Sequence, residues 1–254
     1  PAIKFKKLIE NADKIGAYHI ATGHYCRIKY DEETDEYFVR RGVSLKKDQS
    51  YMLYRLDQQV LRRLIFPLGQ FESKEDIRTL VRGKNLSNAE KKDSQEICFI
   101  NTDYAQYIES LGFASEEGDF VDEEGNILGR HKGILHYTVG QRKGLGIALG
   151  KPAFVTSIDP EKNRVVLGDN YELFNKKVIS EDYFFTAGSP KRFEGKKLYA
   201  KVRYSAKPAA VSYEVYDKKI IATFDEPQRA IAPGQSLVFY LDDVVVGGGF
   251  IVST

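Results

Sequence analysis

The sequence predicts an α/β segment at the N-terminal end, a small mixed central domain and an all-β C-terminal part. Three observations lead to this prediction. Apolar residues at helical spacing precede a short apolar run, glycines and cations gather between residues 129 and 150, and short alternating runs fill the end of the chain. We place the borders so that the three parts span residues 1–102, 103–172 and 173–254.

The first part begins with one amphipathic helix. Its apolar face consists of Phe5, Leu8, Ile9, Ala12 and Ile15. Gly16 follows at the position of a C-cap. Residues 18–22 then predict a short buried strand, and residues 24–30 and 36–42 alternate around an acidic turn, as the strands of a hairpin do. This order is typical of an α/β layer.

Two further helices are predicted before the central domain. One covers residues 51–64, and the other begins at Ser73, whose hydroxyl can cap the helix while Asp76 lies near its positive end. Ile77, Leu80 and Val81 would form the buried stripe of this second helix.

The remainder of the chain is predicted to be mostly strands. A helix through Ile108 and Leu111 leads to an acidic hairpin around residues 123–126. The strands predicted after Pro152 cover residues 154–158, 164–167, 198–204, 209–216, 220–224, 236–241 and 244–252. Short strands with polar, Gly or Pro breaks are typical of a small barrel or a sandwich.

Composition excludes several classes of protein. The chain has 254 residues, with 38 Lys+Arg against 36 Asp+Glu, so its formal charge of +2 gives no general attraction to a polyanion. It has two cysteines, no basic-then-apolar start and no apolar stretch of about 18 residues, which argues against secretion, a disulfide scaffold and a membrane span. We therefore expect a cytoplasmic protein without a membrane partner.

The two cysteines lie in different surroundings. Cys98 stands where a charged segment containing Lys91 and Lys92 meets an apolar, strand-like end, so it could be a reactive thiolate or a buried thiol. Cys26 shares a strand face with Ile28, which favours a core thiol. We assign chemistry to neither from these segments alone.

The four histidines lack metal-site spacing, so no metal site is predicted. His24 follows Gly23 at the end of an apolar strand, where parallel sheets present ligand-contacting loops, although taken alone such a histidine is more often a hydrogen-bonded structural residue. Residues 46–50 place two lysines and an amide before a helix, which could meet phosphate and base edges or simply face solvent.

Three further segments suggest RNA without identifying it. Residues 136–146 mix cations, a tyrosine and glycines, but they fit neither the G-x-G-x-x-G nor the Walker A spacing. Residues 201–204 pair cations with a tyrosine, and residues 233–236 form a turn into a strand. A small β-barrel with exposed Arg, Tyr and Gln is a common platform for single-stranded RNA.

Read in order, several short strings together resemble the tRNA-uridine 2-sulfurtransferase (tRNA-specific 2-thiouridylase) family. They are Ile3-Lys4-Phe5, residues 20–25, Lys47-Asp48-Gln49-Ser50-Tyr51, Phe66-Pro67-Leu68-Gly69, Ile97-Cys98-Phe99-Ile100, residues 137–146 and Pro233-Gly234-Gln235-Ser236. The match covers nearly the whole chain, and the ordered set is specific where each string is not.

The resemblance implies a fold and a reaction. Residues 1–102 would be the remnant of an ATP-pyrophosphatase (adenine nucleotide alpha hydrolase-like) domain, residues 103–172 a tRNA-binding domain and residues 173–254 a β-barrel. ATP, with Mg²⁺, would adenylate the wobble uridine at position 34, and a cysteine persulfide would deliver sulfur to its C2. The expected partners are the Lys, Glu and Gln tRNAs and a persulfide sulfur-donor protein.

The resemblance also assigns residues. Cys98 would carry the persulfide, and a second cysteine would attack it, leaving a disulfide. Gly23 would contact ATP. The positions that match expected tRNA contacts are His24, Lys47, Asp48, Gln49, Arg203, Tyr204 and Gln235.

The chain departs from the family pattern at its start. The Ser-Gly-Gly-Val-Asp-Ser phosphate loop and the second catalytic cysteine are expected before Pro1, and Cys26 does not match that cysteine. We therefore expect these 254 residues to be inactive alone. Two alternatives stay open: a tRNA-binding module without chemistry, and an ATP-pyrophosphatase relative that acts on a small substrate.

Overall fold

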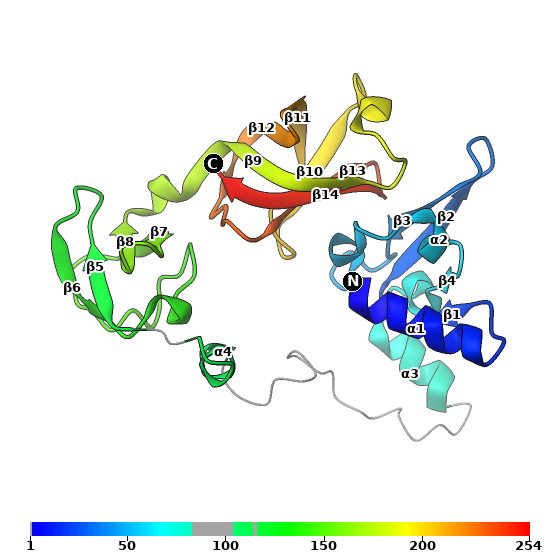
Figure 1. Cartoon of the computed structure of the whole chain (residues 1–254), viewed down its shortest axis with the longest axis horizontal. Coiled ribbons are helices and arrows are strands. Elements are labelled where there is room, and N and C mark those ends of the chain that lie inside the picture. The colour runs from blue at the N-terminus through cyan, green and yellow to red at the C-terminus, as the bar shows by residue number, and fades with distance from the viewer. Residues whose placement is uncertain (1, 83–103, 114–115) are drawn as a thin grey trace. The chain divides into compact units, whose positions relative to one another are not determined.

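A computed structural model describes residues 2–82, 104–113 and 116–254 (Figure 1). The chain divides into two compact units. The first comprises Pro1–Glu90, Lys176–Glu226 and Pro233–Thr254, and the second comprises Lys91–Asn175 and Pro227–Ala232. The N-terminal segment and most of the C-terminal strands therefore share one unit.

The chain begins as predicted, with a helix and a short strand. The helix α1 covers Ala2–Lys14, buries Phe5 and Ala12, and ends before Gly16, whose φ of 71° is the left-handed conformation of a C-cap. The strand β1 (Ile20–Ala21) pairs in parallel with β4 (Leu64–Ile65). The parallel pair confirms the α/β character of this segment.

The helix predicted over residues 51–64 is wrong. This stretch forms a 3₁₀ turn η1 (Ser50–Leu53), a single-turn helix α2 (Gln58–Leu61) and β4, followed by a second 3₁₀ turn η2 (Pro67–Gln70). The Asp57 side chain accepts a hydrogen bond from the Val60 backbone N–H and so caps the N-terminus of α2. Most apolar side chains before and after Asp57 are buried whichever way a single helix would place them, so they do not mark one helical face.

The helix predicted from Ser73 is present as α3 (Lys74–Arg82). The Ser73 hydroxyl accepts from the Asp76 backbone N–H at 3.1 Å, and the Asp76 carboxylate accepts from the Ser73 N–H at 3.0 Å. The predicted buried stripe is wrong, because Leu80 is 55% exposed and Ile77 and Val81 are only half-buried.

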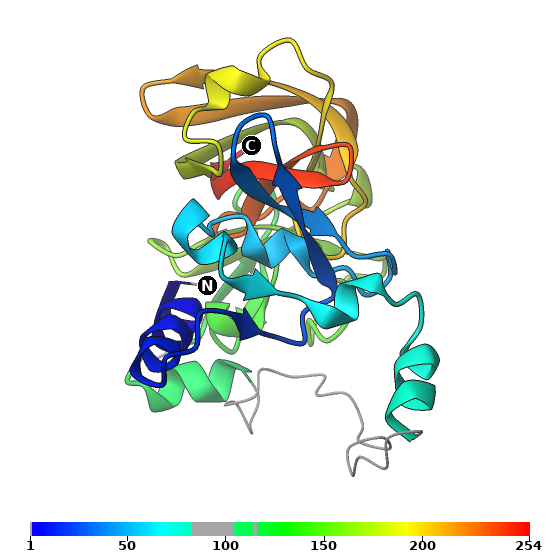
Figure 2. The same cartoon turned by 90° about the vertical axis from the view of Figure 1, so that its right-hand side faces the viewer.

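Six antiparallel strands close into a barrel in the first unit (Figure 2). They are β9 (Phe174–Phe185), β10 (Leu198–Lys201), β11 (Ala209–Tyr216), β12 (Lys219–Arg229), β13 (Ser236–Leu241) and β14 (Val244–Ser253). Their order is β13, β10, β11, β12, β9 and β14, and β13 also pairs with β14. A 3₁₀ turn η5 (Pro190–Phe193) connects β9 to β10. The barrel predicted from the sequence is confirmed.

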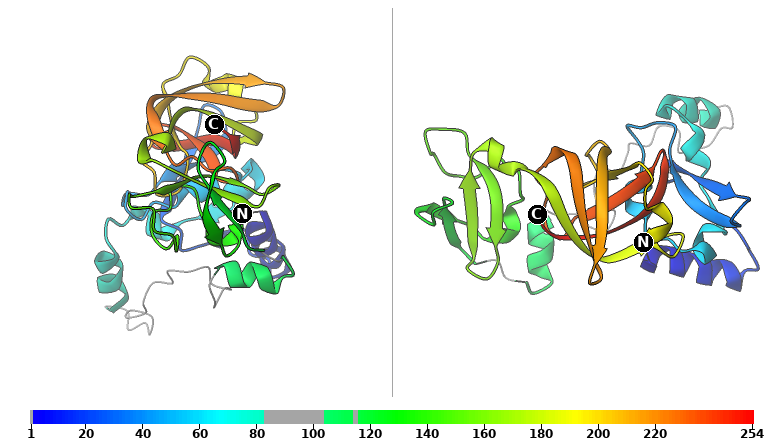
Figure 3. Two further views of the ribbon diagram at one scale, coloured as in Figure 1. Left: turned by 90° about the vertical axis from the view of Figure 1, so that its left-hand side faces the viewer. Right: turned by 90° about the horizontal axis from the view of Figure 1, so that it is seen from above.

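The predicted N-terminal hairpin extends the barrel sheet. Its strands β2 (Cys26–Asp31) and β3 (Glu36–Arg41) pair with each other, and Arg40 of β3 pairs with Val244 of β14. Figures 2 and 3 show the blue hairpin beside the red strand β14. The hairpin was expected within the α/β layer, but its hydrogen bonds attach it to the barrel.

A continuous apolar core therefore joins the N-terminal segment to the barrel. Residues from α1, β1, the hairpin and η1 pack with Val238, Tyr240 and Val245 of the barrel. Cys26 is fully buried in this core, and burial raises the pKa of its thiol, with Asp48 as a second cause. The prediction that Cys26 is a core thiol is confirmed.

The second unit is built on a separate four-stranded sheet, drawn in green in Figure 3. Its elements are α4 (Tyr104–Ser110), β5 (Gly118–Val121), β6 (Ile127–His131), η3 (Ile134–His136), β7 (Phe154–Asp159), β8 (Arg164–Gly168) and η4 (Asn170–Leu173). The strand order is β6, β5, β8 and β7. Phe120, Val155 and Val165 are fully buried at its centre, where Phe120, His131 and Tyr137 make edge contacts.

In the part of the chain that the structure describes, none of the helices has the length and apolar character that a membrane crossing requires.

The Tyr51 hydroxyl should contribute measurably to stability. It donates to the Ser236 carbonyl at 2.7 Å and accepts from the Ser236 N–H at 3.1 Å, so Tyr51→Phe leaves both backbone groups unpaired. We expect a loss of about 1–3 kcal/mol in the free energy of unfolding, measured by denaturant titration. Tyr216, which is 73% exposed, supplies the control, because Tyr216→Phe should leave stability unchanged. Equal stabilities of the two variants would contradict this role.

Candidate functional site

The predicted persulfide carrier, Cys98, lies outside the described residues, as do Lys91 and Lys92. The structure therefore informs the predicted binding residues, which come from several separate segments.

Gly23 and His24 follow the carboxyl end of the parallel strand β1, as the sequence predicted. The Thr22 N–H donates to the Ile65 carbonyl, which fixes the start of this loop against β4. Gly23 is exposed, so its backbone is accessible to a ligand at the strand end.

The His24 imidazole lies between two aromatic rings. Its centroid is 5.8 Å from that of Phe5 and 5.7 Å from that of Phe66, and its Nδ1 shares a 2.7 Å hydrogen bond with the Thr22 hydroxyl. Burial, with a smaller contribution from the charge of Lys4, lowers the pKa of His24 to about 4. The ring is therefore neutral at pH 7 and can contact a ligand through hydrogen bonding or stacking.

The buried carboxylate of Asp48 organises the loop that contains Lys47 and Gln49. One oxygen accepts from the backbone N–H groups of Gly42 and Ser50, at 3.1 and 3.2 Å. The other accepts from the Ser50 hydroxyl at 2.9 Å and from Arg41 Nε at 3.3 Å. Because Asp48 is only 4% exposed, its carboxylate acts within the protein, and its contact with tRNA stays a prediction.

Gln49 connects this loop to the Gly23–His24 loop. The side-chain oxygen of Gln49 accepts from the Tyr25 backbone N–H at 3.0 Å, and the backbone N–H of Gln49 donates to the Tyr25 carbonyl at 3.0 Å. Two predicted contact segments that are distant in the sequence are thus hydrogen-bonded to each other.

Tyr51 joins the last predicted segments, at residues 203–204 and 235, to the loop that contains Asp48 and Gln49. Its ring centroid is 6.3 Å from that of Tyr204, which follows Arg203 after β10, and its hydroxyl is bonded to Ser236, the residue after Gln235. Tyr204 is 42% exposed, and Gln235 is also exposed. The structure therefore places the segments at 47–49, 203–204 and 235 next to Tyr51, and Gln49 joins the first of them to the Gly23–His24 loop.

A cationic groove of about 600 Å³ lies at this junction. Its lining residues are Arg41, Leu45, Lys46, Asp48, Lys201, Tyr204, Ser205, Ala206, Lys207 and Pro208. Four are cations and one is a carboxylate, and that carboxylate is already bonded to Arg41. The groove can therefore attract an anion, although the whole chain carries almost no net charge.

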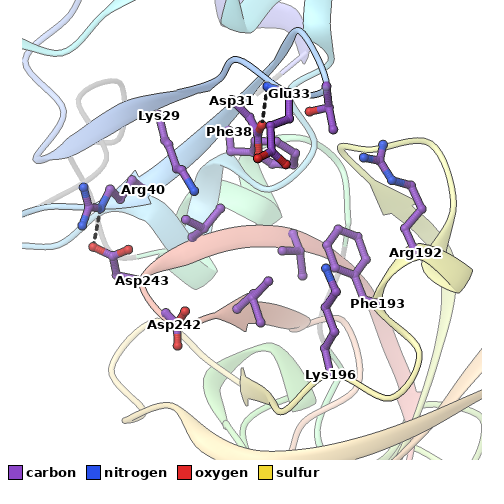
Figure 4. A pocket seen from close by; sticks show the side chains of 14 residues that line it. Lys29, Asp31, Glu33, Phe38, Arg40, Arg192, Phe193, Lys196, Asp242 and Asp243 are labelled. Atoms are coloured by element: carbon purple, nitrogen blue, oxygen red, sulfur yellow. Dashed lines mark hydrogen bonds and ion pairs between the residues drawn. The ribbon is translucent and has the colours of Figure 1, made fainter.

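A second groove in the same unit has a different electrostatic character (Figure 4). It has a volume of about 470 Å³ and lies between the hairpin, η5 and the turn from β13 to β14. Its charged residues are Lys29, Arg40, Arg192 and Lys196, with Asp31, Glu33, Asp242 and Asp243. Because the four cations match the four carboxylates, this mixed-charge groove does not favour a polyanion.

The glycine-rich loop of the second unit is held in place by Gln141. The Gln141 side chain accepts from the Thr138 N–H and donates to the Lys143 carbonyl, both at 3.0 Å. The guanidinium groups of Arg142 and Arg229 lie 6.0 and 5.4 Å from the centroid of the Phe154 ring. The assignment of this domain to tRNA binding stays a prediction.

The structure places four cations at the cationic groove, of which sequence reasoning missed Arg41 and Lys207 and noted Lys46 and Lys201 only as members of the segments 46–50 and 201–204. Lys201 gave a usable signal, because a charged residue ends the otherwise apolar strand β10. Arg41 and Lys207 gave none, since only the fold brings them together. Among the described residues, no group of three or more His, Cys, Asp or Glu side chains is placed to hold a metal ion.

Comparison with protein families defines the class of protein first. Residues 1–102 match the model described as tRNA methyl transferase HUP domain, residues 106–169 the tRNA methyl transferase PRC-barrel domain, and residues 175–251 the Aminomethyltransferase beta-barrel domain. The protein thus has a HUP domain followed by a small middle domain and a β-barrel domain, which confirms the predicted fold class.

Individual relatives then define the family. The chain is 48% identical over 252 residues to the tRNA-specific 2-thiouridylase MnmA of Acetivibrio thermocellus, covering 98% of this chain and 70% of the relative. It is also 48% identical over 252 residues to the protein of the same name from Clostridioides difficile, covering 98% and 69%. The chain belongs to the tRNA-specific 2-thiouridylase family, as the resemblance of its sequence indicated.

The low pKa of His24 makes stability depend on pH. Its pKa of about 4 in the folded chain lies below the ordinary value of 6.5, so the unfolded chain binds more protons between these values. The free energy of unfolding should therefore fall as the pH is lowered from about 6.5 to about 4, and His24→Gln should reduce this dependence. Denaturant titrations at several pH values measure it. Substitution of the exposed His19 by Gln should leave the profile unchanged, and an NMR pKa of His24 near 6.5 would contradict the prediction.

Proposed function

We propose that this protein binds tRNA in the cationic groove and takes part in the transfer of sulfur to a uridine of that tRNA. The chain belongs to a family whose members are named tRNA-specific 2-thiouridylases, which supports a tRNA-thiolating enzyme in general. The observation that carries the proposal is the cationic groove, which Asp48 and the exposed Tyr204 line from two of the predicted contact segments.

The groove has the chemistry that RNA requires. Lys46, Lys201 and Lys207 can neutralise phosphate groups, while the Tyr204 ring can stack on an unpaired base. In the adjoining loop, which Gln49 joins to residues 47–49, His24 is neutral at pH 7 and offers a ring and a hydrogen-bonding nitrogen without charge. We propose that the bound RNA is the anticodon region of a Lys, Glu or Gln tRNA, with the wobble uridine at position 34 as the substrate.

In the proposed reaction Cys98 carries the transferable sulfur as a persulfide. The outer sulfur bonds to C2 of the uridine as the activated C2 oxygen leaves. A second thiolate attacks Sγ of Cys98, the sulfur–sulfur bond of the persulfide breaks, and its electron pair goes with the outer sulfur. The two cysteines end as a disulfide, and a persulfide donor protein reloads Cys98 after that disulfide is reduced by a thiol reductant.

Cys26 is not the second thiol of this proposal. Its side chain is fully buried in the apolar core, and burial raises its pKa, so a thiolate is disfavoured at this position.

We also propose that the reaction uses ATP and Mg²⁺, with Gly23 as a backbone contact of the nucleotide. The exposed Gly23 at the end of a parallel strand fits this role, because glycine has no side chain of its own to hinder the approach to its backbone. ATP supplies the adenylate that makes the C2 oxygen a leaving group. We assign no residue of the described chain to Mg²⁺. As a tRNA-modifying enzyme, the protein would act in the cytoplasm.

Tyr204 should contribute to the affinity for tRNA. Tyr204→Ala removes the exposed ring of the groove, and base stacking on an aromatic ring is worth about 1–3 kcal/mol, or roughly 5- to 150-fold in Kd. Binding of an unmodified tRNA transcript, measured by fluorescence anisotropy, tests this. Tyr216→Ala is the matched control, because Tyr216 is an exposed tyrosine of β11 outside the groove. An unchanged Kd for Tyr204→Ala would remove the ring from the proposed site.

Substitution of Cys98 distinguishes the proposed enzyme from the alternative, a tRNA-binding module without chemistry. In a thiolation assay with the full-length protein of this family, ATP, Mg²⁺ and a persulfide donor, Cys98→Ser should abolish 2-thiouridine while tRNA binding stays unchanged. Cys26→Ala is the control and should retain thiolation, since Cys26 is a core residue. Retained thiolation by Cys98→Ser would exclude Cys98 from the reaction, and a persulfide trapped on Cys98 by mass spectrometry would argue against the module.

The same assay tests the activity of the 254 residues by themselves. The aligned region is 70% of the Acetivibrio thermocellus relative, and we expect these residues to bind tRNA without forming 2-thiouridine. Binding of a small substrate with no salt-sensitive affinity for tRNA would instead favour the remaining alternative, an ATP-pyrophosphatase relative.

A further inference from the structure

Lys201 is a buried cation at the wall of the cationic groove. It is the last residue of β10, pairs with Val238 of β13 and is only 6% exposed. Figure 1 shows β10 and β13 side by side in the barrel. A lysine with so little exposure is uncommon, because removing an ammonium group from water is costly unless another group compensates it.

Two tyrosine rings compensate part of this cost. Lys201 Nζ lies 5.6 Å from the ring centroid of Tyr51 and 5.6 Å from that of Tyr204. The Tyr51 hydroxyl is hydrogen-bonded to Ser236 and makes no hydrogen bond with Lys201, so the contact of Tyr51 with Lys201 is through its ring. The ammonium is thus held between two aromatic rings, one buried and one exposed.

The nearby carboxylate does not complete the coordination of Lys201. Asp48 attracts Lys201 electrostatically, but both Asp48 oxygens already accept hydrogen bonds from Gly42, Ser50 and Arg41. Within the described residues, Lys201 Nζ has neither a hydrogen-bond acceptor nor an ion-pair partner. An ammonium has three donors, so the groove holds a fixed cation whose donors lack protein partners.

We propose that Lys201 binds a phosphodiester group of the tRNA, next to the nucleotide that stacks on Tyr204. A phosphodiester supplies the acceptor oxygens and the negative charge that the described residues do not give to Lys201. Arg41, Lys46 and Lys207 line the same groove and add to the attraction for that anion. Since two rings hold the Lys201 side chain in place, it loses little rotational freedom when the phosphate binds. This inference rests on the proposed binding of tRNA.

The test measures the salt dependence of tRNA binding by the 254-residue chain. Each phosphate contact contributes about one unit to the slope of log K against log [salt]. We expect Lys201→Met, which keeps the apolar stem, to weaken binding of an unmodified tRNA transcript about 5- to 20-fold at 100 mM salt and to reduce the slope by about one. Lys201→Arg should restore most of the slope.

Lys29→Met is the matched control, because Lys29 is an exposed lysine of the mixed-charge groove in the same unit. It should leave both the affinity and the slope unchanged. Thermal unfolding of each variant without tRNA identifies a purely structural effect, and Lys201→Gln replaces Lys201→Met if the latter does not fold.

The outcomes are distinct. Wild-type affinity and slope for Lys201→Met would overturn the inference while the proposed function stands. A lower Tm with weaker binding but an unchanged slope would also overturn it, because Lys201 would then act only on the fold. Absence of salt-sensitive tRNA binding by the wild-type chain would overturn the proposed function itself, and with it the role of Lys201.

Discussion

The candidate site depends on one buried carboxylate. Asp48 is taken out of water between the N-terminal segment and the barrel, and a buried charge is stable only when its hydrogen bonds are satisfied. The backbone of Gly42 and Ser50, the Ser50 hydroxyl and Arg41 satisfy it. These four bonds fold residues 42–50 into a compact loop, which directs Tyr51 toward Ser236 and turns the Gln49 side chain toward Tyr25. Gly42 permits the fold, because a Cβ there would lie 2.7 Å from the Tyr25 carbonyl oxygen.

This loop explains why the groove forms between two parts of the chain that are distant in sequence. Tyr51, Leu53 and Tyr54 enter the same core as Val238 and Tyr240 of the barrel, while β3 pairs with β14 at the sheet edge. The groove walls are therefore attached to one packed core on both sides. Such a surface can present cations and a tyrosine ring with little reorganisation when a ligand binds, which is the physical basis of preorganised recognition. The mixed-charge groove shares this scaffold, but its charges neutralise one another.

The sequence predicted most elements of the fold because their patterns are local. The helix ending at Gly16, the hairpin around residues 31–35 and the barrel strands 209–216 and 236–241 carry clear periodicity and turn residues. The helix predicted over residues 51–64 failed because burial there is set by the barrel, so apolar residues no longer mark one helical face. The strand β9 was not predicted because its first four residues are exposed and include two lysines, which hides the alternation of its buried half. The candidate site followed the same rule. Its segments could be identified from local sequence, but the contacts that join them through Gln49 and Tyr51 depend on the fold.

Local charge in the groove cannot be inferred from composition, because it depends on which carboxylates are already paired. Asp243 bonds to Arg27 and Arg40, and Glu36 bonds to Arg192, so these acids neutralise cations outside the cationic groove. Among the described residues, Asp48 is the single carboxylate that lines that groove, and both of its oxygens already accept hydrogen bonds. Among the described residues, the charge of Lys201 is therefore compensated only by two aromatic rings and by the field of Asp48, without a hydrogen bond or an ion pair. An apolar side chain of similar length would avoid the cost of burying a charge in the free protein, and the phosphodiester contact that we propose would give the energetic reason for a lysine at this position.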